Sequence, residues 1–81
     1  MQIEEVKLRE VLANVFNVSV DMINDEASPD TIEEWDSLRH MNLVVALEEK
    51  FGVELSDDQV VEILSYKLIR IVMSEHGIKF N

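Results

Sequence analysis

The stretch Trp35-Asp36-Ser37-Leu38, which leads into a helical pattern ending at Phe51-Gly52, decides the fold. Residues three and four apart share one face of a helix. The first stripe, which we expect to face the core, consists of His40, Leu43, Val44, Leu47 and Phe51. A second apolar stripe, roughly 150° away around the helix, consists of Leu38, Met41 and Val45. One buried stripe is enough for a helix on the surface of a small domain. The second stripe therefore belongs either to a larger core or to an exposed docking patch.

Ser37 stands at the expected start of this helix, directly after Asp36. Both residue types cap helices well, because their side chains accept the unpaired backbone N–H groups of the first turn. The same N–H groups, together with the positive end of the helix dipole, favour an anion such as phosphate. Ser37 is therefore either an ordinary N-cap or an exposed hydroxyl on which a phosphodiester would be stabilised. Gly52 predicts the helix end, because glycine tolerates the left-handed conformation found there.

The rest of the chain predicts an all-α fold, a small four-helix bundle with three longer helices and one short one. We expect these helices at residues 3–16, 37–51, 57–61 and 66–75 of a single domain covering residues 1–81. Ser56 and Ser65 are the expected N-caps of the last two helices. Residues 17–36 form a long loop between the first two helices, rich in turn-forming residues. The loop side chains expected to be buried are Val18, Val20, Ile23, Ala27 and Ile32.

The composition is typical of a compact helical protein. The chain has 81 residues, of which 47% are hydrophobic, with only 2 Gly and 1 Pro. The absence of cysteine excludes a disulfide framework and a cysteine-based zinc site. No apolar run approaches the length of a membrane span, and the first residues lack the pattern of a signal peptide. We therefore expect a cytoplasmic protein without a membrane span, and a monomer.

The net charge of −10 is concentrated in the middle of the chain. Residues 21–62 contain thirteen acids and two bases, a net charge of −11, whereas the remainder carries +1. This distribution argues against nucleic acid and anionic membranes as partners, because both require basic patches. It favours partners with basic protein surfaces, which electrostatic steering would bring to the acidic segment. A solvated face that serves only solubility is the alternative.

Ser37 and His40 are the one pair that suggests catalysis, since side chains three residues apart on a helix can meet. A serine hydrolase also needs an orienting carboxylate, an oxyanion hole and a substrate cleft. A bundle of this size has little room for such a cleft, so we expect no enzyme activity and interpret His40 as a packing residue. Two histidines 36 positions apart predict no metal site. Trp35 is interpreted as a core residue that anchors the long loop, or alternatively as part of the surface beside Ser37.

The chain resembles the acyl carrier protein family over residues 3 to 76. The resemblance is carried by Asp36-Ser37-Leu38, by Leu43 five residues later, and by the run Ala46-Leu47-Glu48-Glu49-Lys50-Phe51-Gly52-Val53. It implies that a phosphopantetheinyl transferase attaches a 4′-phosphopantetheine arm from coenzyme A to Ser37. The thiol of the arm would hold acyl intermediates as thioesters for fatty-acid or polyketide-type enzymes, or for other specialised biosynthetic enzymes. The residues implied to dock basic partner surfaces are Asp36, Leu38, Met41, Val45, Glu48, Glu49, Asp57 and Asp58.

The sequence departs from the family pattern at Arg39 and Asn42, where carriers of fatty-acid synthesis usually have acidic residues. This departure predicts weaker recognition by the primary fatty-acid enzymes. The combination of Trp35 and His40 is more similar to stand-alone carriers of specialised pathways. Two alternatives stay open. One is an aminoacyl or peptidyl carrier with the same attachment chemistry. The other is an unmodified acidic module that binds a basic partner through the second stripe.

Overall fold

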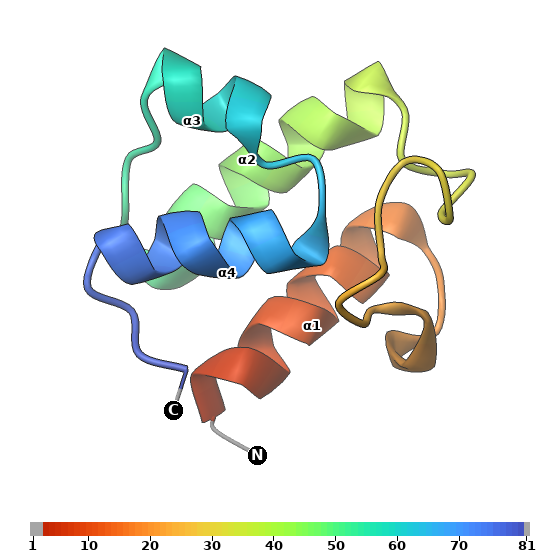
Figure 1. Ribbon diagram of the computed structural model, residues 1–81, viewed down its shortest axis with the longest axis horizontal. Helices are drawn as coiled ribbons and strands as arrows, with labels where there is room; N and C mark the ends of the chain where they lie inside the picture. The colour runs from red at the N-terminus through yellow and green to blue at the C-terminus, as the bar shows by residue number, and fades with distance from the viewer. Residues whose placement is uncertain (1–2, 81) are drawn as a thin grey trace.

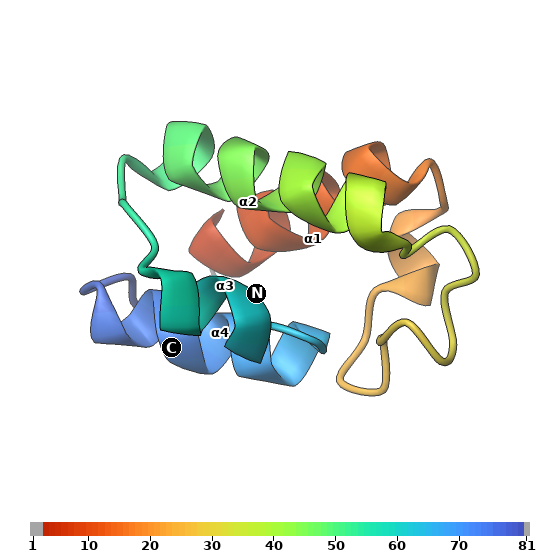
Figure 2. The same ribbon diagram turned by 90° about the horizontal axis from the view of Figure 1, so that it is seen from above.

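The computed structural model describes residues 3–80, which fold into four α-helices and one 3-10 turn (Figure 1). In chain order the elements are α1 (Ile3–Phe16), η1 (Val20–Met22), α2 (Ser37–Phe51), α3 (Asp57–Glu62) and α4 (Tyr66–Glu75). Figure 2 shows α1 and α2 on one side of the molecule, α3 and α4 on the other, and the long loop at one end. The predicted all-α class, with three longer helices and one short one, is confirmed. Positions 1, 2 and 81 of the expected domain lie outside the described residues.

One helix boundary differs from the expectation. α3 extends to Glu62, one residue beyond its expected end. Within residues 3–80, no helix combines the length and the apolarity needed to span a membrane.

Polar caps explain where three of the helices begin. Asp36, Ser56 and Ser65 precede α2, α3 and α4, and each side chain accepts the backbone N–H three residues further on, at 2.8–3.2 Å. Each cap satisfies a donor that the first helical turn leaves unpaired, which stabilises a helix by about 1 kcal/mol. At the other end, α2 stops at Gly52, whose φ of 64° lies in the left-handed region, as predicted.

The first stripe of α2 faces the core. Leu43, Val44 and Leu47 are buried, while His40 and Phe51 are half-buried toward the two ends of the helix. The side chains of the same hydrophobic cluster on α1 and α4 are Leu8, Val11, Leu12, Ala13 and Phe16 of α1 and Tyr66, Ile69, Val72 and Met73 of α4. The second stripe of α2 stays outside this core, so the alternative of a larger core is wrong.

Two arginines that the sequence analysis did not single out hold the long loop against the bundle. Arg9 of α1 donates a hydrogen bond from Nε to the carbonyl oxygen of Ile23, at 2.9 Å. Arg70 of α4 lies with its guanidinium 2.7 Å from the carboxylate of Asp25. The loop therefore has polar attachments to the first and the last helix, and its end is fixed where α2 begins.

The apolar side chains of the loop follow the expectation with one exception. Ile23, Ala27 and Ile32 are buried, and Val18 packs partly against the core. Val20 is 40% exposed, so the expectation that it is buried is wrong. The reason is local: Val20 opens the turn η1, whose three residues lie on the surface while the following Ile23 turns inward.

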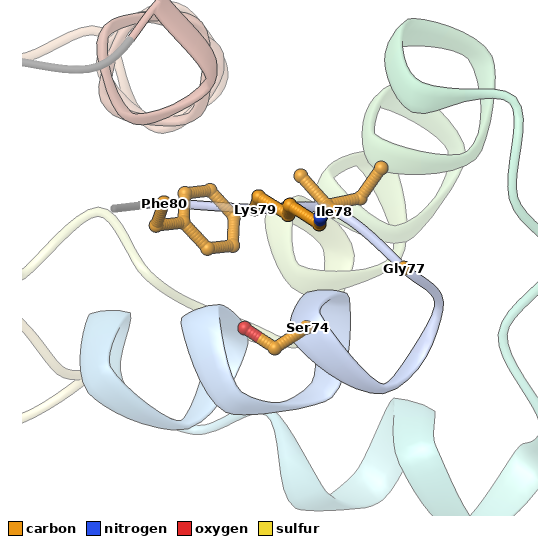
Figure 3. A pocket seen from close by; sticks show the side chains of 5 residues that line it. All are labelled: Ser74, Gly77, Ile78, Lys79 and Phe80. Carbon is orange, nitrogen blue, oxygen red and sulfur yellow. The ribbon is translucent and has the colours of Figure 1, made fainter.

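The C-terminal segment folds back along α4 after Gly77 (Figure 3). Its side chains Ile78 and Phe80 pack partly against the core. Together with Ser74 and Lys79 this segment borders a hollow of about 420 Å³. The lining offers one hydroxyl and one amine, with no acid or imidazole to activate either of them. We therefore interpret the hollow as a packing feature and not as a candidate site.

Candidate functional site

Ser37 is the first residue of α2, and its neighbour Asp36 fills the capping role. Asp36 has extended backbone angles and its Oδ1 accepts the N–H of Arg39 at 2.8 Å. Ser37 is exposed, and its hydroxyl makes no side-chain hydrogen bond to the described residues. The interpretation of Ser37 as an ordinary N-cap is therefore wrong. By contrast, the hydroxyls of Ser56 and Ser65 are both engaged as caps.

The surroundings of Ser37 fit a covalently attached phosphate. The hydroxyl lies at the N-terminus of a 15-residue helix, where the dipole and the unpaired N–H groups favour a negative charge. A phosphodiester is already an anion, so it would gain this stabilisation without burial. The exposed position also leaves the hydroxyl accessible to a second protein that could transfer a group to it.

Trp35 and His40 form a hydrogen-bonded bridge directly beside Ser37. Trp35 Nε1 donates to His40 Nδ1 at 3.0 Å, and the two ring planes differ by only 20°. The other ring nitrogen, Nε2 of His40, lies 2.8 Å from the carbonyl oxygen of Val60 in α3. Since Nδ1 accepts the indole proton, we assign the ring proton of the neutral imidazole to Nε2, which donates to Val60. The bridge thus joins the long loop, α2 and α3.

This bridge excludes the hydrolase hypothesis. A histidine that activates Ser37 needs a free ring nitrogen directed at the serine hydroxyl. Both ring nitrogens of His40 are occupied, one by Trp35 and one by Val60. Within residues 3–80 there is also no group of three His, Cys, Asp or Glu side chains able to hold a metal ion.

An apolar groove of about 600 Å³ opens beside Ser37, between the start of α2 and the end of α3. Most of the surface that lines it is carbon. The lining residues are Pro29, Trp35, Asp36, Ser37, His40, Met41, Val60, Val61 and Leu64. Sequence analysis placed Trp35 and His40 near Ser37 but missed Val60 and Val61 of α3 and Leu64 just after it, all more than twenty residues further along the chain. Their only signal in the sequence is an apolar face on a short helix.

The second stripe of α2 forms an exposed apolar patch next to Ser37. Leu38 is 73% exposed, and Met41 and Val45 are each 52% exposed. An apolar patch rimmed by polar residues is typical of an interaction site. An exposed acidic side chain, that of Glu49, lies further along the same helix, near the end of α2.

The other acids implied as docking residues differ in how freely they can bind a partner. Asp57 and Asp58 are exposed in the first turn of α3. Asp36 is exposed but already accepts the N–H that caps α2. Glu48 is half-buried, and its Oε2 accepts the backbone N–H of Leu55 at 2.9 Å. Its carboxylate therefore holds the connection between α2 and α3 in place.

Comparison with known proteins agrees with this geometry. Residues 6–70 match the family described as phosphopantetheine attachment site. The chain is 38% identical to an acyl carrier protein of Nitratidesulfovibrio vulgaris over 69 residues, which cover 83% of this chain and 87% of that protein. It is 38% identical to an acyl carrier protein of Helicobacter pylori over 58 residues, covering 72% and 74% of the two chains. An acyl carrier protein of a Sulfurovum species is 41% identical over 54 residues, covering 64% and 69%.

Proposed function

The chain belongs to the acyl carrier protein family, and from this membership we propose that Ser37 carries the 4′-phosphopantetheine arm. Members of the family carry acyl groups and do not catalyse their conversion, and phosphopantetheine is their prosthetic group. The finer proposal is that the protein presents acyl intermediates to fatty-acid or polyketide-type enzymes, or to those of another specialised biosynthetic pathway. The observation that carries the attachment proposal is the exposed, uncommitted hydroxyl of Ser37 at the start of α2.

The attachment step matches the chemistry of this hydroxyl. Ser37 Oγ would attack the phosphorus of coenzyme A that bears the pantetheine, and its proton would leave. The new Oγ–P bond replaces the pyrophosphate bond, and adenosine 3′,5′-bisphosphate departs. Among the described residues, the imidazole nearest in sequence to Ser37 is that of His40, and both of its ring nitrogens are engaged elsewhere. A separate phosphopantetheinyl transferase must therefore supply the catalysis.

Once attached, the arm supplies a thiol that holds an acyl group as a thioester. The contribution of this chain is to anchor and to present the arm. The N-terminus of α2 stabilises the phosphodiester. The Asp36 cap keeps the first turn of α2 formed, and thus fixes the direction in which Ser37 points.

The exposed patch of α2 supports a role in docking partner enzymes. Leu38, Met41 and Val45 supply apolar contact area beside the attachment residue. The exposed acids Glu49, Asp57 and Asp58 would attract basic enzyme surfaces and speed encounter. Because Glu49 lies about one helical turn after Val45 on α2, steering and apolar contact would act on the same partner.

The attachment proposal is tested by intact-mass analysis. The protein is incubated with coenzyme A, magnesium and a broad-specificity phosphopantetheinyl transferase, in parallel with Ser37→Ala and Ser65→Ala variants. We expect one phosphopantetheinyl group on the parent and on Ser65→Ala, and none on Ser37→Ala. Ser65 is the matched control because it is also a serine at a helix start, but its hydroxyl caps α4.

Two results would contradict the attachment of the arm to Ser37, and a third would change the class of cargo. A folded parent that gains no mass with several transferases would leave the unmodified interaction module as the explanation of the acidic patch. Mass gain on Ser37→Ala would move the attachment to another residue. Loading with aminoacyl groups but not with acyl groups, after modification, would favour the aminoacyl or peptidyl carrier instead.

A further inference from the structure

Trp35 lies in the wall between the apolar groove and the core. Trp35 is among the residues that line the groove beside Ser37. It is nevertheless buried, with only 5% of the residue exposed, and its ring stacks on Phe16 at a centroid distance of 4.7 Å. Phe16 itself is fully buried among the core side chains of α1. A chain that passed from the groove into the bundle at this point would have to displace the indole.

His40 fixes the indole in that wall. The bond from Trp35 Nε1 to His40 Nδ1 satisfies the only polar group of the indole. The ring would therefore gain no hydrogen bond by turning outward toward water. His40 is held in turn by Val60, at 2.8 Å. It is therefore a positioning residue that acts through Trp35.

The same bridge keeps α3 close to α2. α3 is only six residues long, so its position depends on contacts with the rest of the bundle and not on its own stability. Widening the space between α2 and α3 would break the bond from His40 to Val60. The bridge therefore opposes both ways of opening a path into the core, which are turning of the indole and movement of α3.

We propose that Trp35, positioned by His40, keeps the thioester-bound cargo out of the core and confines it to the external groove between α2 and α3. This inference rests on the proposed function, because it concerns the group carried on Ser37. The groove includes the attachment residue Ser37, and its apolar lining includes Met41, Val61 and Leu64. It suits the apolar part of an acyl group while leaving one side of that group open to solvent and to partner enzymes.

The cargo class follows from this arrangement. A closed core cavity selects saturated apolar chains, because a polar group placed inside it would lose its hydration without compensation. An open groove imposes no such penalty, since a hydroxyl or keto group can face water. An open groove of this kind therefore admits acyl groups that bear polar substituents as well as simple apolar ones.

The position of the cargo is tested by nuclear magnetic resonance on the carrier labelled with ¹³C and ¹⁵N and loaded from unlabelled octanoyl-coenzyme A. Isotope-filtered contacts between the octanoyl chain and the protein are expected at Met41, Val61 and Leu64. None are expected at the ring of Phe16. The indole N–H of Trp35, the only tryptophan in the chain, is expected to exchange at the same rate, within about twofold, in the acetyl- and octanoyl-loaded forms.

Variants test the role of His40 separately. In His40→Ala we expect faster exchange of the indole N–H, by about fivefold or more, and octanoyl contacts that reach Phe16. Trp35→Leu, which keeps an apolar side chain but leaves space, is expected to give the same contacts with Phe16. His76→Ala is the matched control, because His76 is also half-buried and bonded, but to Gln59 and away from the groove. It should behave as the parent does.

Contacts between octanoyl and Phe16 in the parent would overturn the inference, and so would the absence of contacts with the groove. Contacts that stay in the groove in both His40→Ala and Trp35→Leu would overturn the roles of these two residues. Failure of the protein to gain mass on loading would refute the attachment proposal, and the inference with it. Loading followed by core contacts would refute the inference alone.

Discussion

The carboxylate of Asp36 accepts the backbone N–H of Arg39 at 2.8 Å, and this bond separates two roles that the sequence had placed on adjacent residues. Asp36 completes the first turn of α2, while the hydroxyl of Ser37 is left without a structural task. A serine that caps a helix would have to give up its hydrogen bond when it is modified, and the helix start would weaken. The proposed modification of Ser37 would leave the Asp36 cap intact.

Replacement of Asp36 separates its cap from its charge. Asp36→Ala removes both, and we expect the free energy of unfolding to fall by about 1 kcal/mol. Asp36→Asn keeps a side-chain oxygen for the N–H of Arg39, so its stability should stay within about 0.5 kcal/mol of the parent. Urea denaturation measures both values. Equal losses in the two variants would mean that the charge of Asp36, and not its hydrogen bond, stabilises α2.

The same pair of variants reports on docking. If the carboxylate contacts a basic surface of the transferase, Asp36→Asn should lower the kcat/KM of modification although the fold is unaffected. The matched comparison is Asp30→Asn, which removes an exposed acid of the long loop that does not line the groove beside Ser37. A modification rate of Asp36→Asn equal to that of Asp30→Asn would remove Asp36 from the docking surface.

Glu48 and Glu49 are neighbours with different expected roles. Glu48→Ala leaves the backbone N–H of Leu55, a residue that is 7% exposed, without its acceptor, so we expect a loss of about 1–2 kcal/mol in the free energy of unfolding. Glu49→Ala removes an exposed side chain and should change stability by less than about 0.5 kcal/mol. Glu49→Ala, in contrast, should weaken binding to a basic partner enzyme.

Thermal unfolding and partner titration check the two halves of this prediction. Glu48→Gln serves as the control, because its amide oxygen can still accept the N–H of Leu55. The assignment of Glu48 to the fold is wrong if Glu48→Ala is as stable as the parent. The assignment of Glu49 to docking is wrong if its replacement leaves partner affinity unchanged at low salt.

The features that sequence reasoning captured are those set by residues close together in the chain. The spacing of Leu43, Val44 and Leu47 defines the buried face of α2 without reference to any other element. Ser56 and Ser65 cap helices through bonds that reach only three residues ahead. For such features, backbone geometry converts spacing directly into structure.

The features that sequence reasoning missed are set by residues far apart in the chain. His40 meets Val60 across 20 residues, and Arg70 meets Glu5 across 65. No local period encodes such a pairing, since it depends on how the helices cross. The sequence left the second stripe of α2 undecided for the same reason. The outcome depends on whether another helix covers Leu38, and none does.

Tyr66 gives a prediction in alkaline solution. Burial of its hydroxyl, followed by the nearby carboxylate of Glu5, raises the pKa of Tyr66 from 10.0 to about 12. The unfolded chain loses this proton near pH 10, whereas the folded protein keeps it until about pH 12. The contribution to stability is therefore complete below pH 10 and is lost as the pH rises toward 12.

Tyr66→Phe isolates this effect. The difference between the parent and the variant should be constant below pH 10, and above it the parent should lose about 1–3 kcal/mol more than the variant. The rest of the chain is the same in both proteins, so its contribution cancels in the difference. At pH 7 the variant should be as stable as the parent or more so, because the Tyr66 hydroxyl is buried without a partner among the described residues. A marked loss of stability at pH 7 would show that the hydroxyl is satisfied after all.

Arg39 and Asn42 offer a test of pathway preference. Arg39 is half-buried in the first turn of α2 and Asn42 is exposed further along the helix, close to the apolar patch. Restoring acids at both positions, in Arg39→Asp with Asn42→Glu, should raise the kcat/KM of primary fatty-acid enzymes for this carrier by about tenfold at low salt. An acid in the first turn is also favourable to the helix dipole, so no loss of fold is expected.

The control for this change is Lys50→Glu, which alters the net charge as much as Arg39→Asp does but lies in the last turn of α2. A charge effect that is specific to the docking surface should appear with Arg39→Asp and not with Lys50→Glu. It should also shrink as ionic strength rises and exposed charges are screened. If the two variants gain equally, the enzymes respond to overall acidity. If neither gains, the difference at Arg39 and Asn42 does not set partner choice, and the reason to place this carrier outside primary fatty-acid synthesis is gone.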